Sequence, residues 1–139
     1  MNSVRIARRI IDSMLGDSRC NSSREICGLL AGREGIITAA FPASNAHSNP
    51  ATAYEIAPDE LFRIFRKIRE LGLELLAIYH SHPTSENTPS PADIERAYYP
   101  DAAYFIVSPQ PDAKNPVRAF RIQNGRAEEL KVETIGQGN

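Results

Sequence analysis

Apolar residues recur along the chain with two different periods, and each period predicts a different kind of element. Residues 4–15 place apolar side chains three and four positions apart, the spacing of an amphipathic helix, and Gly16 is expected to end it. A second helix is predicted to begin at Pro58, with acidic residues in its first turn, and to end at Gly72.

Other segments have the composition of strands, as short apolar runs or alternating positions bounded by turn residues. The predicted strands are residues 25–32, 35–41, 53–56, 73–79, 102–108, 117–122 and 126–134. Asn124 and Gly125 separate the last two and predict a type I′ hairpin, while residues 17–23 are expected to be a loop and 135–139 a frayed end. Helices interleaved with strands predict an α/β protein with a three-layer α/β/α arrangement around a mixed sheet.

Length and composition narrow the class of protein. The chain has 139 residues, which predicts one domain over residues 1–139. With 16 basic and 17 acidic residues and no basic run, it is not expected to bind nucleic acid. No apolar stretch is long enough to predict a membrane span or a signal peptide. Cys20 and Cys27 fit no disulfide framework, which favours a cytoplasmic location.

Two of the three histidines lie one residue apart, directly after an apolar run. Residues 73–79 are a predicted strand, and alternate residues of a strand point to the same face. His80 and His82 are therefore expected to aim both imidazoles into one space where the strand ends. Either histidine alone would more often be a hydrogen-bonded residue of the core or the surface. The pair at this spacing favours a metal site, because neutral imidazole is a common metal ligand.

Asp93 is the candidate for a third ligand. Residues 90–93, Ser-Pro-Ala-Asp, have the form of a helix start, with Ser90 as N-cap, and the helix is expected to continue over 94–99. If the preceding loop folds back, the Asp93 carboxylate reaches the two histidines. Two histidines, an aspartate and one position for water are the composition of a catalytic zinc site. The same Ser-x-x-Asp pattern is also an ordinary capping arrangement.

These residues resemble the JAMM motif of the MPN-domain zinc peptidases. The motif is His-Ser-His-Pro, a seven-residue spacing from the second histidine to a serine, and an aspartate three positions later, as in residues 80–93. The family also carries an upstream Glu-x-x-Gly-x-Leu, which residues 25–30 match. One departure is Ala77, where many members have glycine. The similarity extends over about residues 4–122.

The resemblance implies an MPN fold and a peptidase that uses one zinc ion held by His80, His82 and Asp93. Glu25 would be the general base for the attacking water, and Ser90 would donate a hydrogen bond to the oxyanion. The implied partner is a ubiquitin-like or sulfur-carrier protein with a C-terminal Gly-Gly, cleaved at the amide bond that follows. The carrier, the native metal and the oligomeric state stay open.

Other functions are compatible with parts of the pattern. A zinc amidohydrolase acting on a small-molecule amide needs the same ligands. A non-catalytic MPN scaffold would have lost ligands, whereas all five motif positions are present here. A zinc deaminase needs His-x-Glu and Pro-Cys-x-x-Cys, which the sequence lacks. His47, in the predicted loop 42–52, is expected to be exposed, and Glu25 without the downstream motif would be expected at a solvated strand edge.

Overall fold

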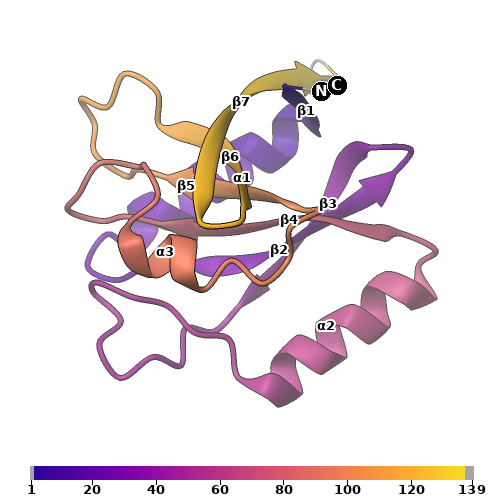
Figure 1. Ribbon diagram of the computed structural model, residues 1–139, viewed down its shortest axis with the longest axis horizontal. Helices are drawn as coiled ribbons and strands as arrows, with labels where there is room; N and C mark the ends of the chain where they lie inside the picture. Colours follow the sequence, from indigo (N-terminus) through magenta and orange to yellow (C-terminus); the bar gives the residue numbers. More distant parts are fainter. Residues whose placement is uncertain (1, 137–139) are drawn as a thin grey trace.

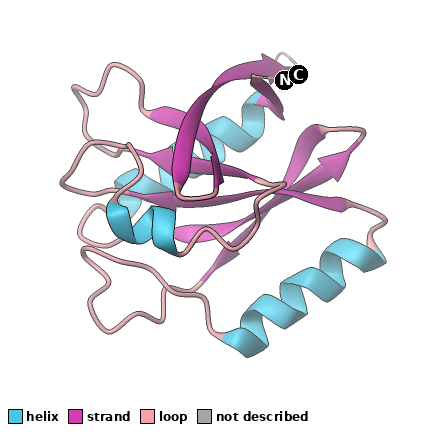
Figure 2. Ribbon diagram, in the orientation of Figure 1, coloured by secondary structure: helices cyan, strands magenta, loops and turns pink. Residues whose placement is uncertain are grey.

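The structure is a computed structural model that describes residues 2–136 (Figures 1 and 2). Within that range the chain forms seven strands and three helices. The strands are β1 (Ser3–Ala7), β2 (Cys27–Arg33), β3 (Ile36–Ala43), β4 (Glu74–Ser81), β5 (Ala103–Val107), β6 (Val117–Gln123) and β7 (Arg126–Ile135). The helices are α1 (Arg8–Cys20), α2 (Pro58–Glu70) and α3 (Pro91–Glu95).

One mixed sheet contains these strands in the order β1-β3-β2-β4-β5-β6-β7. β4 and β5 run parallel, and β1 runs parallel to both β3 and β7, whereas the other pairs are antiparallel. Because β7 pairs with β1, the sheet closes into a barrel. The predicted α/β class and mixed sheet are confirmed. The predicted three-layer α/β/α arrangement is not confirmed, because it does not include this closure.

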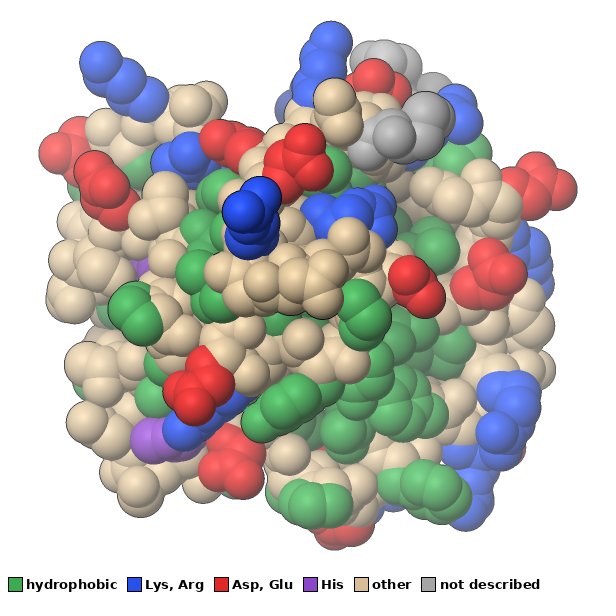
Figure 3. Space-filling model, viewed as in Figure 1, with side chains coloured by type: hydrophobic (Ala, Val, Ile, Leu, Met, Phe, Trp, Pro, Cys, Tyr) green, Lys and Arg blue, Asp and Glu red, His purple; other side chains and the backbone are tan. Residues whose placement is uncertain are grey.

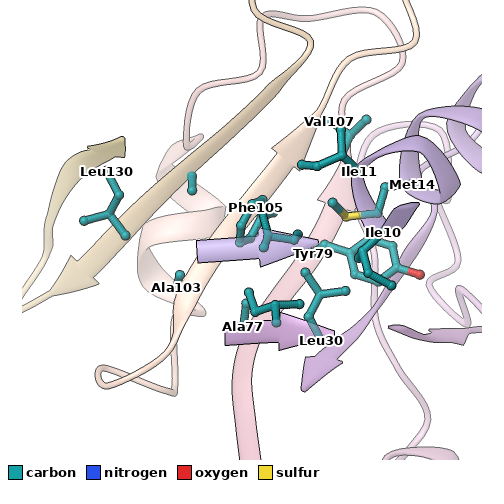
Figure 4. Packing of buried hydrophobic residues seen from close by; sticks show 13 residues of the cluster. Ile10, Ile11, Met14, Leu30, Ala77, Tyr79, Ala103, Phe105, Val107 and Leu130 are labelled. Carbon is teal, nitrogen blue, oxygen red and sulfur yellow. The ribbon is translucent and has the colours of Figure 1, made fainter. Parts of the chain in front are cut away.

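Helices cover both faces of the central strands, because alternate side chains of a strand point to opposite sides. On one face α1 packs over a cluster that includes Leu30, Tyr79 and Phe105 (Figure 4). On the other face Ile64 of α2 packs with Leu29 of β2. A third cluster joins β4, β5 and β6 to the segment around α3. The end of β4 is thus held between separate apolar clusters.

The N-terminus differs from the helix predicted over residues 4–15. The first of these residues belong to β1, and the helix α1 begins only after it. Val4 and Ile6 fit either element, but β1 is paired with β7 and β3, and this pairing fully buries Ile6. Gly16 lies inside α1, so the predicted helix end is wrong, as is most of the loop predicted over 17–23. Pairing with distant strands outweighed the local periodicity.

Three other predictions need correction. Residues 53–56 form no strand and belong to an irregular segment between β3 and α2. Helix α3 begins after the N-cap Ser90 as predicted, but most of its expected continuation over 94–99 is not helical. Ile135 is the last residue of β7, so the predicted frayed end is wrong there. Residues 137–139 of that predicted end lie outside the described residues.

The turn between β6 and β7 confirms the predicted hairpin. Asn124 has a φ of 54° and Gly125 a φ of 75°, and a type I′ turn needs positive values at both positions. None of the helices within residues 2–136 has the length and apolar character that crossing a bilayer would require. Basic and acidic side chains are interspersed over the face shown in Figure 3, in keeping with a net charge of −1.

Candidate metal centre and active site

The end of β4 brings the two histidines together, as their spacing predicts. His80 is the second-last residue of β4, and His82 is the first residue after the strand. Their Nε2 atoms are 3.1 Å apart, and the ring centroids are 4.9 Å apart. Both side chains are buried, with 1% of His80 and 4% of His82 exposed. The two buried imidazoles therefore direct their Nε2 atoms into the same small space.

Asp93 completes a group of three side chains that could hold a metal ion. Its Oδ2 atom lies 3.2 Å from Nε2 of His80 and 3.0 Å from Nε2 of His82. Ligand atoms about 2.0–2.1 Å from a tetrahedral metal ion are about 3.3 Å from one another, so the observed spacing is close to that of a coordination shell. A site of three protein ligands also leaves a fourth position for water.

The loop between β4 and α3 is folded back by its own polar side chains. Asn87, which is buried, donates from Nδ2 to the carbonyl oxygens of Ile106 (3.2 Å) and Asn115 (2.7 Å). Nδ1 of His82 donates to the carbonyl oxygen of Glu86 at 2.7 Å. With Nδ1 held as a donor, Nε2 of His82 either carries a proton that it donates to Asp93 or gives its lone pair to a metal ion that takes the place of that proton. The donor set thus fits a metal ion.

Helix α3 starts with a capping box, so the predicted capping arrangement and the predicted cluster are both present. The Asp93 amide donates to Oγ of Ser90 at 3.1 Å, and the Ser90 amide donates to Oδ2 of Asp93 at 3.0 Å. The oxygen that caps the helix is therefore the one that faces the histidines. Because the Ser90 hydroxyl accepts in the cap, its own proton stays available to a further acceptor.

Burial and hydrogen bonding set the charge states of the three groups. Burial disfavours the charged imidazole and lowers the pKa of His80. Burial acts in the same direction on His82, but hydrogen bonds to Asp93 and to the Glu86 carbonyl outweigh it and raise its pKa. Burial would raise the pKa of Asp93, but hydrogen bonds from both histidines hold it well below its usual range. Asp93 is therefore an anion at neutral pH, as a metal ligand must be.

Glu25 is brought to this site by the pairing of its neighbour with the end of β4. The Ile26 amide donates to Oγ of Ser81 at 2.9 Å, and the Ser81 amide donates to the Ile26 carbonyl at 3.1 Å. Only 5% of Glu25 is exposed, so the alternative prediction of a solvated strand edge is wrong. Burial raises its pKa to about 7, with His82 acting to lower it and Asp93 to raise it. Because Ile26 is bonded to Ser81, which lies between the two histidines, Glu25 lies at the same end of β4 as they do.

A cavity of about 450 Å³ opens beside Ser90 and Asp93. Its wall includes residues from β2, β4, β5, the start of α2, the region of α3 and the irregular segment before α2. Leu29 and Ile78 supply apolar wall, while Arg96 is the one basic side chain among the described residues that line it. A chain segment could therefore lie next to the three-residue cluster without first displacing part of the fold.

The segment before α2 supplies a residue that the sequence did not point to. Tyr54 stacks on His80, with ring centroids 4.5 Å apart and an interplanar angle of 21°. His47, the residue considered for this loop, is half-buried and accepts a hydrogen bond at Nδ1 from the Asn49 amide, which is a local turn contact. A tyrosine in a short apolar stretch gives no signal for such a stack, since the contact joins residues far apart in the chain.

The chain is similar to known proteins over most of its length. Residues 7–123 match the family of prokaryotic homologs of the JAB domain. The chain is 40% identical over 104 residues to a desampylase of Haloferax volcanii, covering 70% of this chain and 75% of the relative. It is 32% identical over 130 residues to the CysO-cysteine peptidase of Mycobacterium tuberculosis, covering 92% and 88%. A probable TtuB-protein conjugate cleaving protease of Thermus thermophilus is 36% identical over 123 residues, covering 86% and 78%.

Solved structures share the architecture. A Desulfitobacterium hafniense protein studied in solution superposes with a TM-score of 0.84 at 26% identity, covering 96% of this chain and 94% of the other. A structure described as a metalloprotease-like JAMM zinc site in the proteasome and signalosome gives a TM-score of 0.60 at 18% identity, covering 94% and 97%. At that identity the likeness concerns the fold alone. With the family match over residues 7–123, the chain belongs to the prokaryotic JAB-domain family.

Proposed function

We propose that the chain is a zinc-dependent peptidase that hydrolyses the amide bond after the C-terminal Gly-Gly of a ubiquitin-like or sulfur-carrier protein. The observation that carries the proposal is the convergence of His80, His82 and Asp93 atoms within 3.2 Å, close to a buried glutamate with a pKa of about 7. Relatives in the family are a desampylase, a CysO-cysteine peptidase and a probable TtuB-protein conjugate cleaving protease, which supports the substrate class.

One zinc ion per chain is proposed, held by His80, His82 and Asp93. Two imidazole nitrogens and one carboxylate oxygen suit zinc and leave it one open position. When bound, the ion supplies Lewis acidity that lowers the pKa of water to about 7. The protein contributes the orientation of the ligands, since the Glu86 carbonyl fixes the tautomer of His82 and the capping box fixes Asp93.

Glu25 is proposed as the group that moves the proton. A carboxylate oxygen of Glu25 would take a proton from the attacking water and later deliver it to the leaving amine. A general base works best when its pKa lies near the working pH, and burial raises the pKa of Glu25 to about 7. With such a pKa, Glu25 can both accept the proton from water and release it to the leaving amine.

Ser90 is proposed as a donor to the oxyanion that forms at the scissile carbonyl. Its hydroxyl oxygen accepts from the Asp93 amide at 3.1 Å, which holds the side chain in place at the helix start. The hydroxyl proton can then point to the developing negative charge. A donor already held in position stabilises the transition state without having to reorganise. The capping and catalytic roles of Ser90 are compatible.

The cavity next to Ser90 and Asp93 is proposed to receive the substrate chain. A volume of about 450 Å³ exceeds the space that two glycines need and leaves room for flanking residues. The same volume is typical of small-molecule sites, which favours a zinc amidohydrolase acting on a small amide as the second candidate. We also propose one domain over residues 1–139 and a cytoplasmic protein, the latter because Cys20 and Cys27 are both free thiols.

Cleavage of a defined conjugate tests the proposal. A carrier protein ending in Gly-Gly and joined by an amide bond to a peptide is incubated with the zinc-loaded protein, with the chelator-treated protein and with the Glu25→Gln variant. Only the zinc-loaded wild type should release the carrier. The variant should bind zinc normally yet lose about 10²–10⁴ in rate, because only the proton transfer is removed. Hydrolysis of small amides without hydrolysis of the conjugate would favour the second candidate instead.

A further inference from the structure

Hydrogen bonds join the irregular segment between β3 and α2 to the residues just before β2, and Asn45 makes several of them. Nδ2 of Asn45 donates to the carbonyl oxygens of Glu25 and Ala53, each at 2.9 Å. Its Oδ1 accepts from the Glu55 amide at 3.2 Å. The residues on either side of Tyr54 are therefore bonded to the same side-chain amide. This anchor sets the position of the Tyr54 ring relative to the backbone of the proposed base.

From that position Tyr54 covers one face of a proposed metal ligand. Its ring lies 4.5 Å from the His80 imidazole, centroid to centroid, and the planes are inclined by 21°. His80 is 1% exposed, and the stack is one of the contacts that shield its ring from solvent. Tyr54 also lines the cavity that adjoins Ser90 and Asp93. One aromatic ring thus separates the cavity from the ligand.

The two histidines differ in how their second ring nitrogen is held. Nδ1 of His82 donates to a backbone carbonyl at 2.7 Å, the usual way in which a metal-binding histidine is oriented. Nδ1 of His80 is buried and has no hydrogen-bond partner among residues 2–136. On its Nδ1 side the His80 ring is therefore held, within the described chain, by packing and not by a hydrogen bond. The parallel ring of Tyr54 is the feature of the structure that can do so.

We propose that Tyr54 is a positioning residue for the metal, whose stack on His80 replaces the missing hydrogen bond at Nδ1. The inference rests on the metal site of the proposed function and extends it to a residue outside the JAMM motif. Stacked aromatic rings resist tilting, because tilt breaks contact over the whole face. His80 is thereby kept with Nε2 directed at His82 and Asp93 before any ion arrives. The Tyr54 hydroxyl plays no part in this role.

Zinc affinity, measured by competition with a chromogenic chelator, tests the proposal without any substrate. Tyr54→Leu should weaken zinc binding by about 10–100-fold, the usual cost of losing a group that orients a ligand. Tyr54→Phe keeps the ring and should bind zinc as the wild type does. Tyr98→Leu is the matched control, since Tyr98 lines the same cavity but is 72% exposed, and it should leave zinc affinity unchanged.

Denaturation of each metal-free variant shows whether it is folded. If Tyr54→Leu does not fold, Tyr54→Met fills the space with a flexible apolar chain and should show the same loss of zinc affinity. Unchanged affinity in a folded variant without the ring overturns the proposal, as does a Tyr54→Phe variant that binds as weakly as Tyr54→Leu. A wild-type protein that binds no zinc overturns the proposed function as well, so the two failures are distinguishable.

Discussion

At the scale of single residues, Glu25 shows most clearly how the fold changes the chemistry of a side chain. A carboxylate at the start of an apolar strand costs free energy when it is buried, because its charge loses hydration. Here the carboxyl group is 5% exposed and its pKa is raised to about 7. The site therefore holds a group that stays partly protonated at neutral pH, at a cost in stability.

That cost predicts a pH dependence of the metal-free protein. Between pH 4.5 and about 7 the folded state keeps a proton on Glu25 that the unfolded state has released, so the free energy of unfolding falls as the pH rises. The free energy of unfolding changes by at most about 1.4 kcal/mol per pH unit, or about 3 kcal/mol over this window. Glu25→Gln lacks this effect, so its stability relative to wild type should be greater at pH 8 than at pH 4 in urea denaturation. An equal difference at both pH values would contradict the raised pKa.

Ser90 allows the capping role and the catalytic role to be measured separately. Ser90→Ala should lower the free energy of unfolding by about 1 kcal/mol through the lost cap. It should also lower the rate on a conjugate by about 10²–10³ through the lost oxyanion donor. Ser90→Thr keeps the hydroxyl and should retain most of both. If the rate falls only as far as the small loss of stability explains, Ser90 acts as a helix cap and not as an oxyanion donor.

At the scale of elements, the site depends on how closely β2 lies against its neighbours. Gly28 is paired with Tyr79 of β4 and Pro42 of β3. A Cβ atom at this position would lie 2.6 Å from the carbonyl oxygen of Phe41 and 2.6 Å from Cε2 of Tyr79. Glycine is required here for space, and its position between Glu25 and the rest of β2 makes it part of the support for the proposed base.

Two glycine substitutions with opposite expected signs test this packing. Gly28→Ala should destabilise the protein by about 1–3 kcal/mol, because the backbone carbonyl cannot move aside cheaply. Gly16→Ala lies inside α1 with nothing within 4 Å of the added atom. It should stabilise the protein by about 0.5–1 kcal/mol through helix propensity. Denaturant midpoints of both variants provide the measurement, and a neutral Gly28→Ala would show that β2 and β4 are not so closely packed.

The scale of the whole molecule adds two features that single elements do not contain. Pairing of β1 with β7 closes the barrel and joins the two ends of the described chain (Figure 1). The proposed metal ligands come from the end of β4, the residue after it and α3, while the proposed base precedes β2. An ion held by His80, His82 and Asp93 would therefore bridge two elements, so that metal binding and global stability are linked.

Metal addition and removal should reveal that linkage. Zinc at about 100 times its dissociation constant is expected to stabilise the folded protein by about 2.7 kcal/mol, and a chelator should reverse the effect. Protons compete for the histidines, so the gain should shrink as the pH falls towards about 6.5, the pKa of an ordinary histidine, and below it. The raised pKa of His82 would start this competition at a higher pH than an ordinary histidine would. Thermal unfolding with and without zinc at several pH values measures it, and a stability that zinc leaves unchanged at pH 7.5 would contradict the proposed site.

Local features of this protein could be predicted from the sequence alone. The spacing of His80 and His82 at a strand end, the capping box at Ser90 and the hairpin at Asn124 depend on residues a few positions apart. Their backbone preferences and hydrogen bonds are nearly complete within each segment. The helix predicted over residues 4–15 failed in its first part because the same apolar spacing also suits a strand.

Only the tertiary structure decided the rest. Whether residues near Ile6 pair as a strand, and whether Glu25 lies beside the histidines or in solvent, depends on contacts between segments far apart in the chain. The stack of Tyr54 on His80 is of the same kind. Sequence patterns record which side chains an element offers to a core. The free energy gained by burying them depends on how distant segments pack together. The same packing decides which charged groups and rings lie next to them.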